Sequence, residues 1–326
     1  MDFLPDPCRE DFVEAVRDLR ERSAQLPPEY LVVLVGDMIT EEALPTYMNM
    51  LNLMEAGQDS SGADRDGFSV WTRGWTAEEN RHGDLLSSYL YLGGRVDMRA
   101  VDRTTENLIR NGMNGGMEKN PYLTFIYTSF QERATKISHA NTARLAKAYG
   151  DDHLARICGL IAGDEARHEE AYKRIVEQIL SRDPDGAVLA FADMMKKGIM
   201  MPAALMDDDD DGGEKWKTTT TTTTRRSSGG ATPLFDDYAM VAQDLGVYTA
   251  RDYAAIVQHL VDRWQLGSIT GLSGEAAQAQ EFLLGHAQKI QRLADIAERR
   301  KASRTGKGVP TAKTFSWIFH DKVHLT

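Results

Sequence analysis

The sequence has few cysteines, no long apolar run and a deficit of positive charge. Its 326 residues include two cysteines, Cys8 and Cys158, which lie too far apart to suggest a disulfide framework. Because Cys158 stands among small and apolar residues, we expect a buried free thiol there. No stretch of about 18 apolar residues is present, so no membrane span is expected. The net charge of -11 disfavours non-specific binding to nucleic acid.

No signal or transit peptide is recognisable at the start of the chain. Residues 1–7 read as an abrupt loop, as if a preceding segment had been removed. Residues 206–231 are low in complexity, with five aspartates and seven threonines, and cannot bury enough apolar surface to order themselves. We expect a surface loop there, within one domain that spans residues 1–326.

Apolar periodicity predicts an almost entirely helical chain. We expect Pro45 to kink a long helix and Thr76 to cap the helix that follows the loop at 58–68. The alternating tail at 314–319 predicts a short strand or hairpin. Helices are expected at 11–26, 30–57, 76–92, 97–110, 121–149, 153–180, 187–197, 234–245, 249–264 and 274–301.

The most informative pattern is a glutamate followed three residues later by a histidine, which occurs twice. Glu79 precedes His82, and Glu165 precedes His168. On a helix this spacing places both side chains on one face, about 5–6 Å apart at their Cβ atoms. Two such helices, each paired with a helix that carries another glutamate, supply the ligands of a di-iron site in a four-helix bundle.

The spacing of the chain supplies the two further glutamates. Glu132 lies 18 residues before Gly150 and Glu165 lies 15 residues after it, so both are about 22–27 Å from the turn. An antiparallel hairpin therefore brings them level. In the first half of the chain, either Glu41 or Glu42 takes the equivalent place. Spacing also leaves a choice between Glu78 and Glu79, although Glu79 matches the second copy of the pattern.

Four carboxylates and two histidines suit a pair of ferrous ions. The carboxylates bridge the ions and cancel their charge, and the histidines complete a set that leaves positions open for O₂. Without metal, four glutamates buried together would repel one another and lose their hydration. A matched depth on four helices therefore predicts a metal site rather than four surface glutamates.

Four segments carry a resemblance to a known family. Residues 36–47, 75–84, 127–135 and 315–319 resemble the soluble plant acyl-[acyl-carrier-protein] desaturases, which include the stearoyl-carrier-protein desaturases. The resemblance covers nearly the whole chain except 206–231. It implies a ferritin-like bundle with additional helices, and it resolves both choices among the ligands. The metal ligands that it implies are Glu41, Glu79, His82, Glu132, Glu165 and His168.

The resemblance also implies residues that assist the metal site. Thr135, one turn after Glu132, would manage protons beside the face that binds oxygen. Asp164 would orient a ligand histidine by a hydrogen bond. Trp75 is a further candidate for contact with a ligand, with simple packing as the alternative.

The activity that the resemblance implies is O₂-dependent desaturation. A cis double bond would be introduced into a saturated fatty acyl chain held on acyl carrier protein. Reduced ferredoxin would supply electrons to two iron ions. The protein would be a homodimer of the plastid stroma. The N-terminal segment of the family, with a tryptophan on a proposed electron path, is absent from this chain.

The resemblance places the far end of an apolar tunnel at six residues. Bulk at Leu53 and Thr124, where the stearoyl enzymes carry smaller residues, would shorten the tunnel and favour a 16-carbon chain. A basic cluster at Lys289, Arg292, Arg299, Arg300, Lys301, Arg304 and Lys307 would dock the acidic carrier protein. The six tunnel residues are Met50, Leu53, Met54, Gly115, Thr124 and Phe125.

Two other functions use the same ligands. A ferritin-like protein that oxidises or stores iron needs the cluster but no long apolar tunnel. A di-iron hydroxylase would insert oxygen rather than remove hydrogen. The spacing of the ligands does not separate these possibilities.

Overall fold

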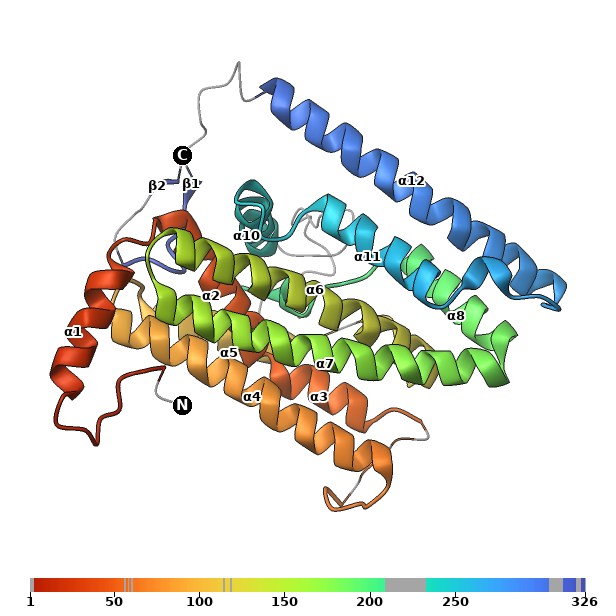
Figure 1. The fold of residues 1–326 in the computed structure, drawn as a ribbon, viewed down its shortest axis with the longest axis horizontal. Coiled ribbons are helices and arrows are strands. Elements are labelled where there is room, and N and C mark those ends of the chain that lie inside the picture. Colours follow the sequence, from red (N-terminus) through yellow and green to blue (C-terminus); the bar gives the residue numbers. More distant parts are fainter. Residues whose placement is uncertain are drawn as a thin grey trace, which may run out of the picture.

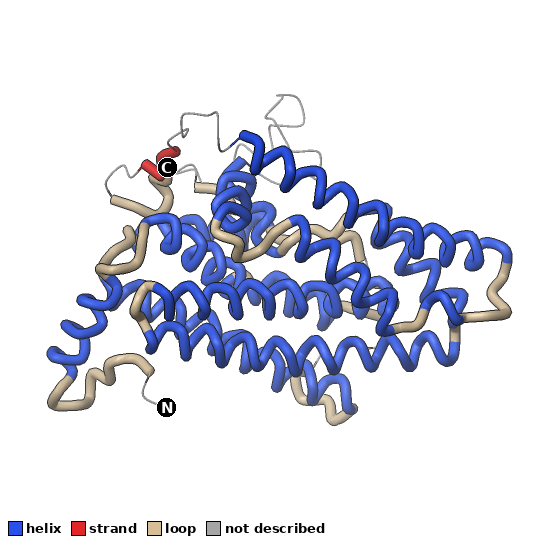
Figure 2. The backbone as a smooth tube through the Cα atoms, turned by 45° about the horizontal axis from the view of Figure 1, so that its top comes forward, coloured by secondary structure: helices blue, strands red, loops and turns tan. Residues whose placement is uncertain are grey.

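The computed structural model describes residues 3–55, 57, 59, 61–113, 115–117, 119–208, 233–304, 313–320 and 324–325. Within these ranges the chain is a stack of long helices with one very short sheet (Figures 1 and 2). Most of the predicted low-complexity loop, from residue 209 to 231, lies outside the described residues.

The described residues form the following helices and strands in chain order. The elements are α1 (Phe12–Ser23), α2 (Pro28–Glu42), α3 (Leu44–Asn52), α4 (Gly67–Gly93), α5 (Met98–Asn111), α6 (Pro121–Ala148), α7 (Asp152–Arg182), α8 (Pro184–Lys197), η1 (Pro202–Leu205), α10 (Pro233–Asp244), α11 (Ala250–Arg263), η2 (Leu266–Ser268), α12 (Gly274–Arg304), β1 (Lys313–Thr314) and β2 (His324–Leu325). The prediction of an all-α fold is therefore confirmed.

Four helices form the bundle that positions the site. Helix α2 packs against α4 and α6, and α7 packs against the same two helices, so the four close a ring. Helices α6 and α7 run antiparallel with extensive contact (Figure 1). Helices α8, α11 and α12 pack together on one side of this bundle, and α10 packs on α2. The arrangement is that of a ferritin-like four-helix core with added helices.

Local sequence explains where the core helices begin and end. Asp66 caps α4, since its side chain accepts hydrogen bonds from the backbone N–H groups of Phe68 and Ser69 at 2.9 and 3.0 Å. Asn120 caps α6 in the same way. Gly150, with φ of +91°, makes the turn between α6 and α7, a conformation that glycine adopts without strain. The hairpin predicted at this glycine is confirmed.

Pro45 starts a helix rather than kinking one. The helix expected over 30–57 is two helices, α2 and α3, which meet at Ala43. Pro45 lies in the first turn of α3, where the missing N–H costs little because it has no partner inside a helix start. This break leaves Glu41 in the last turn of α2.

One further helix boundary was predicted wrongly, and the predicted short C-terminal hairpin is present with different bounds. Thr76 does not cap α4, which begins nine residues earlier at Gly67, because the Asp66 carboxylate supplies a stronger start. The tail at 314–319 is not a strand throughout. Lys313 and Thr314 pair with Leu325 and His324, while 315–319 form a turn whose aromatic side chains are buried.

The core consists of two apolar clusters that flank the middle of the bundle. One cluster contains α2 side chains with Tyr30, Tyr89 and Phe315. The other contains Phe130 and Tyr172 and reaches α8 and α11. Cys158 is buried in the first cluster and Cys8 is exposed, both as free thiols, as expected. Within the described residues, no helix combines the length and apolarity that a bilayer-spanning segment needs.

A test of helix packing comes from Gly36 on α2. A Cβ atom built there would lie 2.0 Å from the Tyr238 ring of α10, so Gly36→Ala forces two packed helices apart. We expect a loss of about 1–3 kcal/mol in stability, read as a lower Tm in thermal unfolding. Gly74 on α4 has nothing within 4 Å, and Gly74→Ala is the control that leaves stability unchanged or raises it by up to about 1 kcal/mol. Equal Tm values for the two variants would contradict this packing.

Candidate metal centre

Six side chains from the four core helices meet in the interior of the bundle. They form two overlapping groups, each with ligand atoms within 4.8 Å of one another. The first group is Glu41, Glu79, His82 and Glu165, and the second is Glu79, Glu132, Glu165 and His168. Because Glu79 and Glu165 belong to both groups, they would be shared if two metal ions were bound. Glu41 with His82, and Glu132 with His168, would each hold one ion.

All six residues are buried, and none is more than 5% exposed. Four of their polar atoms find no hydrogen-bond partner among the described residues, namely Glu79 Oε1, His82 Nδ1, Glu165 Oε1 and His168 Nδ1. Nevertheless His82 Nδ1 lies 3.2 Å from Glu165 Oε1, and His168 Nδ1 lies 3.0 Å from Glu79 Oε1. Burying a polar atom without a hydrogen bond costs free energy, because the atom loses its contact with water. Two metal ions would satisfy them, so the residues fit a dimetal centre.

The protein without metal relieves the crowding of charge by taking up protons. Burial and the neighbouring Glu165 raise the pKa of Glu132 to about 8, and burial raises the pKa of Glu79 well above its usual value. Burial alone would lower the pKa of His168, but the Glu132 and Glu79 carboxylates beside its Nδ1 raise it to about 11. Metal ions must therefore displace protons when they bind.

Each histidine is held from outside by an acid of the other helix. His82 Nε2 donates to Asp164 Oδ2 at 3.1 Å, and His168 Nε2 donates to Glu78 Oε2 at 2.8 Å. Arg81 and Arg167 each contact both acids. These bonds fix the ring orientation with Nδ1 facing the centre. Asp164 thus lies where the sequence analysis expected it.

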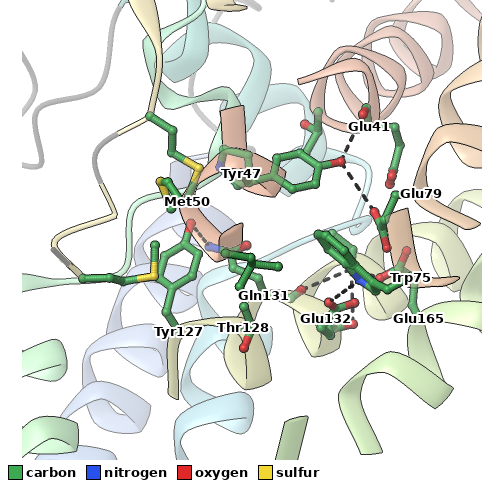
Figure 3. Close-up of a pocket in the computed structure, with 16 residues that line it drawn as sticks. Glu41, Tyr47, Met50, Trp75, Glu79, Tyr127, Thr128, Gln131, Glu132 and Glu165 are labelled. Carbon is green, nitrogen blue, oxygen red and sulfur yellow. Dashed lines mark hydrogen bonds between the residues drawn. The ribbon is translucent and has the colours of Figure 1, made fainter. Parts of the chain in front are cut away.

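The carboxylates are also held by donors. Thr135 Oγ1 donates to Glu165 Oε2 at 2.6 Å, and Trp75 Nε1 donates to Glu132 Oε1 at 3.0 Å. The contact expected of Trp75 is therefore present (Figure 3). Tyr47 OH donates to the Glu41 backbone carbonyl at 3.0 Å and lies 3.5 Å from Glu79 Oε2.

Two cavities border the cluster, and they share Thr40, Glu41 and Thr135 in their walls. The first, shown in Figure 3, has a volume of about 60 Å³ and is lined by Met50, Met113 and Met117 as well as the metal-site glutamates. The second has a volume of about 310 Å³ and lies among α2, α6, α10 and α11.

The six predicted tunnel residues have different positions in the structure. Met50 lines the first cavity, and Gly115 packs against the Met117 side chain of its wall. Met54, Thr124 and Phe125 are buried but are not among the lining residues of either cavity. Leu53 does not match the expectation, because its side chain is 46% exposed and lines neither cavity. It is the C-cap residue of α3.

Sequence reasoning missed three features of the site. Glu78 was considered only as a rival ligand, whereas it holds His168. The signal was present, since both copies of the motif read acid-Glu-x-Arg-His, as Glu78 to His82 and as Asp164 to His168. His139, which contacts Glu41, and the second cavity had no signal in the spacing.

The fold is a four-helix bundle with added helices, and its buried cluster of four glutamates and two histidines fits a dimetal centre. The chain belongs to the fatty acid desaturase family, because the family model described as "Fatty acid desaturase" matches residues 1–319.

Relatives with assigned names support this membership. The chain is 54% identical over 324 residues to stearoyl-[acyl-carrier-protein] 9-desaturase, chloroplastic, of Simmondsia chinensis, and 55% identical over 324 residues to the Brassica napus protein of that name. It is 55% identical over 323 residues to the 9-desaturase 1 of Oryza sativa subsp. indica. Each match covers 99% of this chain, and 75%, 75% and 78% of the respective relatives.

The choice between Glu41 and Glu42 can be tested by metal content. Glu42 lies outside both ligand groups, and its side chain lies against Gly83 of α4. We expect Glu41→Gln to retain about half of the metal bound by Glu42→Gln, since it weakens one of two positions. Elemental analysis after reconstitution with iron measures this. Equal metal content in the two variants would remove Glu41 from the ligand set.

Proposed function

We propose that this chain is an O₂-dependent acyl-[acyl-carrier-protein] desaturase. It introduces a cis double bond into a saturated fatty acyl chain, with electrons from reduced ferredoxin. The observation that carries the proposal is the contact of the metal cluster with two cavities whose shared wall contains Glu41 and Thr135. An extended chain that occupies both cavities passes directly beside the metal ligands.

The proposed reaction balances with one O₂ per double bond. Two adjacent methylene groups lose one hydrogen each, and O₂ with these hydrogens, two electrons and two protons gives two waters. When bound to the six ligands, a pair of iron ions supplies the oxidising chemistry that an unactivated C–H bond requires. The residues Glu41, Glu79, His82, Glu132, Glu165 and His168 would hold this pair.

The protein contributes position, dryness and control of protons. The exposed surface of the first cavity is mainly apolar, with three methionine and three aromatic side chains among its lining residues, and it excludes water and holds the chain in an extended form. Thr135 borders both cavities and donates to Glu165, so its hydroxyl is placed to pass a proton between the substrate space and the cluster. These features distinguish the site from a store of iron, which needs no apolar cavity.

The size of the first cavity supports the preference for a 16-carbon chain. A cavity of about 150 Å³ holds a molecule as small as benzene, so about 60 Å³ accommodates only a short methyl end. The named relatives are stearoyl, and thus 18-carbon, desaturases. We propose that Met50, Met113 and Met117 shorten this end of the tunnel in the present chain.

Product analysis tests the reaction and the chain length together. With iron, O₂ and reduced ferredoxin, 16:0 and 18:0 carrier-protein substrates should give monounsaturated products, with a higher kcat/KM for 16:0. Met117→Ala enlarges the first cavity and should move the ratio towards 18:0 by roughly tenfold, since a methylene in an apolar pocket is worth about 1–3 kcal/mol. Mass spectrometry identifies the products.

Leu53→Ala is the matched control, because Leu53 is exposed and outside the cavity wall. It should leave the ratio unchanged. A wild-type preference for 18:0 would overturn the chain-length proposal while leaving desaturation intact. Hydroxylated products would identify a hydroxylase, and iron oxidation without any lipid product would identify a ferritin-like protein.

Helix α12 offers a docking face for the acidic carrier protein. Lys289, Arg292 and Arg299 are exposed, and Leu293 and Ile296 between them are 55% and 43% exposed. Helix α12 packs on α11, whose residues line the second cavity, so the face lies on the side where an acyl chain would enter. The side chains of Arg300, Lys301, Arg304 and Lys307 lie outside the described residues.

Charge reversal tests this face. Arg292→Glu combined with Arg299→Glu should raise KM for the carrier-protein substrate several-fold with little change in kcat, since it weakens binding alone. Arg99→Glu on α5 is exposed and serves as the control. The difference should shrink at high salt. An unchanged KM in the double variant would exclude α12 as the dock.

We also propose a homodimer in the plastid stroma. The support is the resemblance noted above and the word "chloroplastic" in the names of the relatives. Size-exclusion chromatography with light scattering tests the dimer.

A further inference from the structure

Two of the four carboxylates belong to only one ligand group each, and each accepts a hydrogen bond from a ring N–H. Trp75 Nε1 donates to Glu132 Oε1 at 3.0 Å. His139 Nε2 donates to Glu41 Oε1 at 2.7 Å. Both pairs are buried, with His139 only 1% exposed. The two positions therefore have corresponding donors of different chemical type.

Each of these donors bonds one particular oxygen of its carboxylate, and the other oxygen lies near a histidine. With Oε1 occupied by His139, the remaining Glu41 Oε2 lies 3.6 Å from His82 Nδ1. With Oε1 occupied by Trp75, the remaining Glu132 Oε2 lies 3.3 Å from His168 Nδ1. In both cases this other oxygen faces the histidine of the same metal position, so the donor sets which oxygen is offered to the metal.

The place of His139 is fixed by the packing of α6 on α2. His139 follows Glu132 by seven residues, which returns it to the same face of α6. Asp37 and Glu41, four residues apart, share a face of α2. Asp37 accepts hydrogen bonds from Ser138 and Thr142 at 2.8 and 3.0 Å, on either side of His139.

The Asp37 bonds lock the register between the two helices. Asp37 is 4% exposed, so its carboxylate depends on these donors and on the more distant Tyr238 hydroxyl at 3.3 Å. Sliding α6 along α2 by one residue would break them. In this register of α6 on α2, His139 lies opposite Glu41 and is the donor from which Glu41 Oε1 accepts its hydrogen bond.

We propose that His139 is a positioning residue for the Glu41–His82 metal position, as Trp75 is for the Glu132–His168 position. The proposal rests on the dimetal centre of the proposed function. Outer partners of this kind typically change metal affinity by about 10–100-fold when they are removed. Loss of His139 should therefore weaken one of the two positions, with the other kept.

The test is a titration of full-length metal-free protein with Co²⁺, followed by visible absorption. Wild type should bind two ions tightly. His139→Ala should bind one ion tightly and the second about 10–100-fold more weakly. His139→Gln, whose amide nitrogen can replace Nε2 as a donor, should stay within about threefold of wild type. Circular dichroism of each metal-free variant establishes that it folds.

Trp75→Phe provides the matched comparison at the other position. It should also leave one tight ion, and the double variant His139→Ala/Trp75→Phe should leave none. One tight ion remaining in the double variant would show that both residues act on the same position, which overturns the assignment. Equal weakening in His139→Ala and His139→Gln would overturn the role of the hydrogen bond.

The outcomes separate this proposal from the proposed function. If wild type fails to bind two ions, the dimetal centre itself is wrong, and the proposed function fails with it. If wild type binds two ions and His139→Ala titrates identically, only the role of His139 is overturned.

Discussion

The structure depends on the cost of burying four carboxylates in the middle of a helical bundle. A lone buried carboxylate loses its hydration, and four together repel one another. In this chain each of the four carboxylates lies beside a hydrogen-bond donor, a histidine or a space that suits a cation. The raised pKa of Glu132 and Glu79 shows that the protein without metal still carries part of this cost.

This constraint explains the arrangement of the surrounding polar groups. Asp164 and Glu78 hold the histidines, and Thr135, Trp75 and His139 hold carboxylates. Each donor leaves an atom pointing into the centre. A set of ligands fixed in this way would bind metal without rearrangement, as the proposed oxidation of a substrate requires. In that proposal, the apolar cavities on both sides would determine which part of the substrate lies beside the metal ligands.

The two cavities differ in size and in the elements that surround them, so the two sides of the site are distinguishable. The larger one is bordered by α10 and α11, on the side of the molecule where α12 displays basic and apolar residues. The smaller one ends among methionines, which are flexible and fill irregular space. In the proposed function, an acyl chain tethered at one end would enter through the larger, second cavity and place its free end in the smaller, first cavity. Membership of the fatty acid desaturase family and the arrangement of the two cavities both favour the proposed desaturation.

Short-range features were largely readable from the chain. The pairing of Glu79 with His82 and of Glu165 with His168 follows from helical spacing alone. The depth of Glu132 follows from its distance to the Gly150 turn. Two predicted helix boundaries were wrong because a nearby residue is a better helix start. Asp66 is a better cap than Thr76, and Pro45 in a first helical turn starts α3 instead of bending a longer helix.

The sequence by itself determined most of the helices, the hairpin at Gly150 and most of the side chains that meet in the bundle, because these depend on periods and distances along one chain; spacing left open the choices at Glu41 or Glu42 and at Glu78 or Glu79. Only the tertiary structure decided that Glu78 holds His168, that His139 faces Glu41, and that Leu53 points to solvent. It also decided the shape of the cavities. These features depend on how the helices cross and which residues from different helices become neighbours, and the periodicity of a single segment does not predict such contacts.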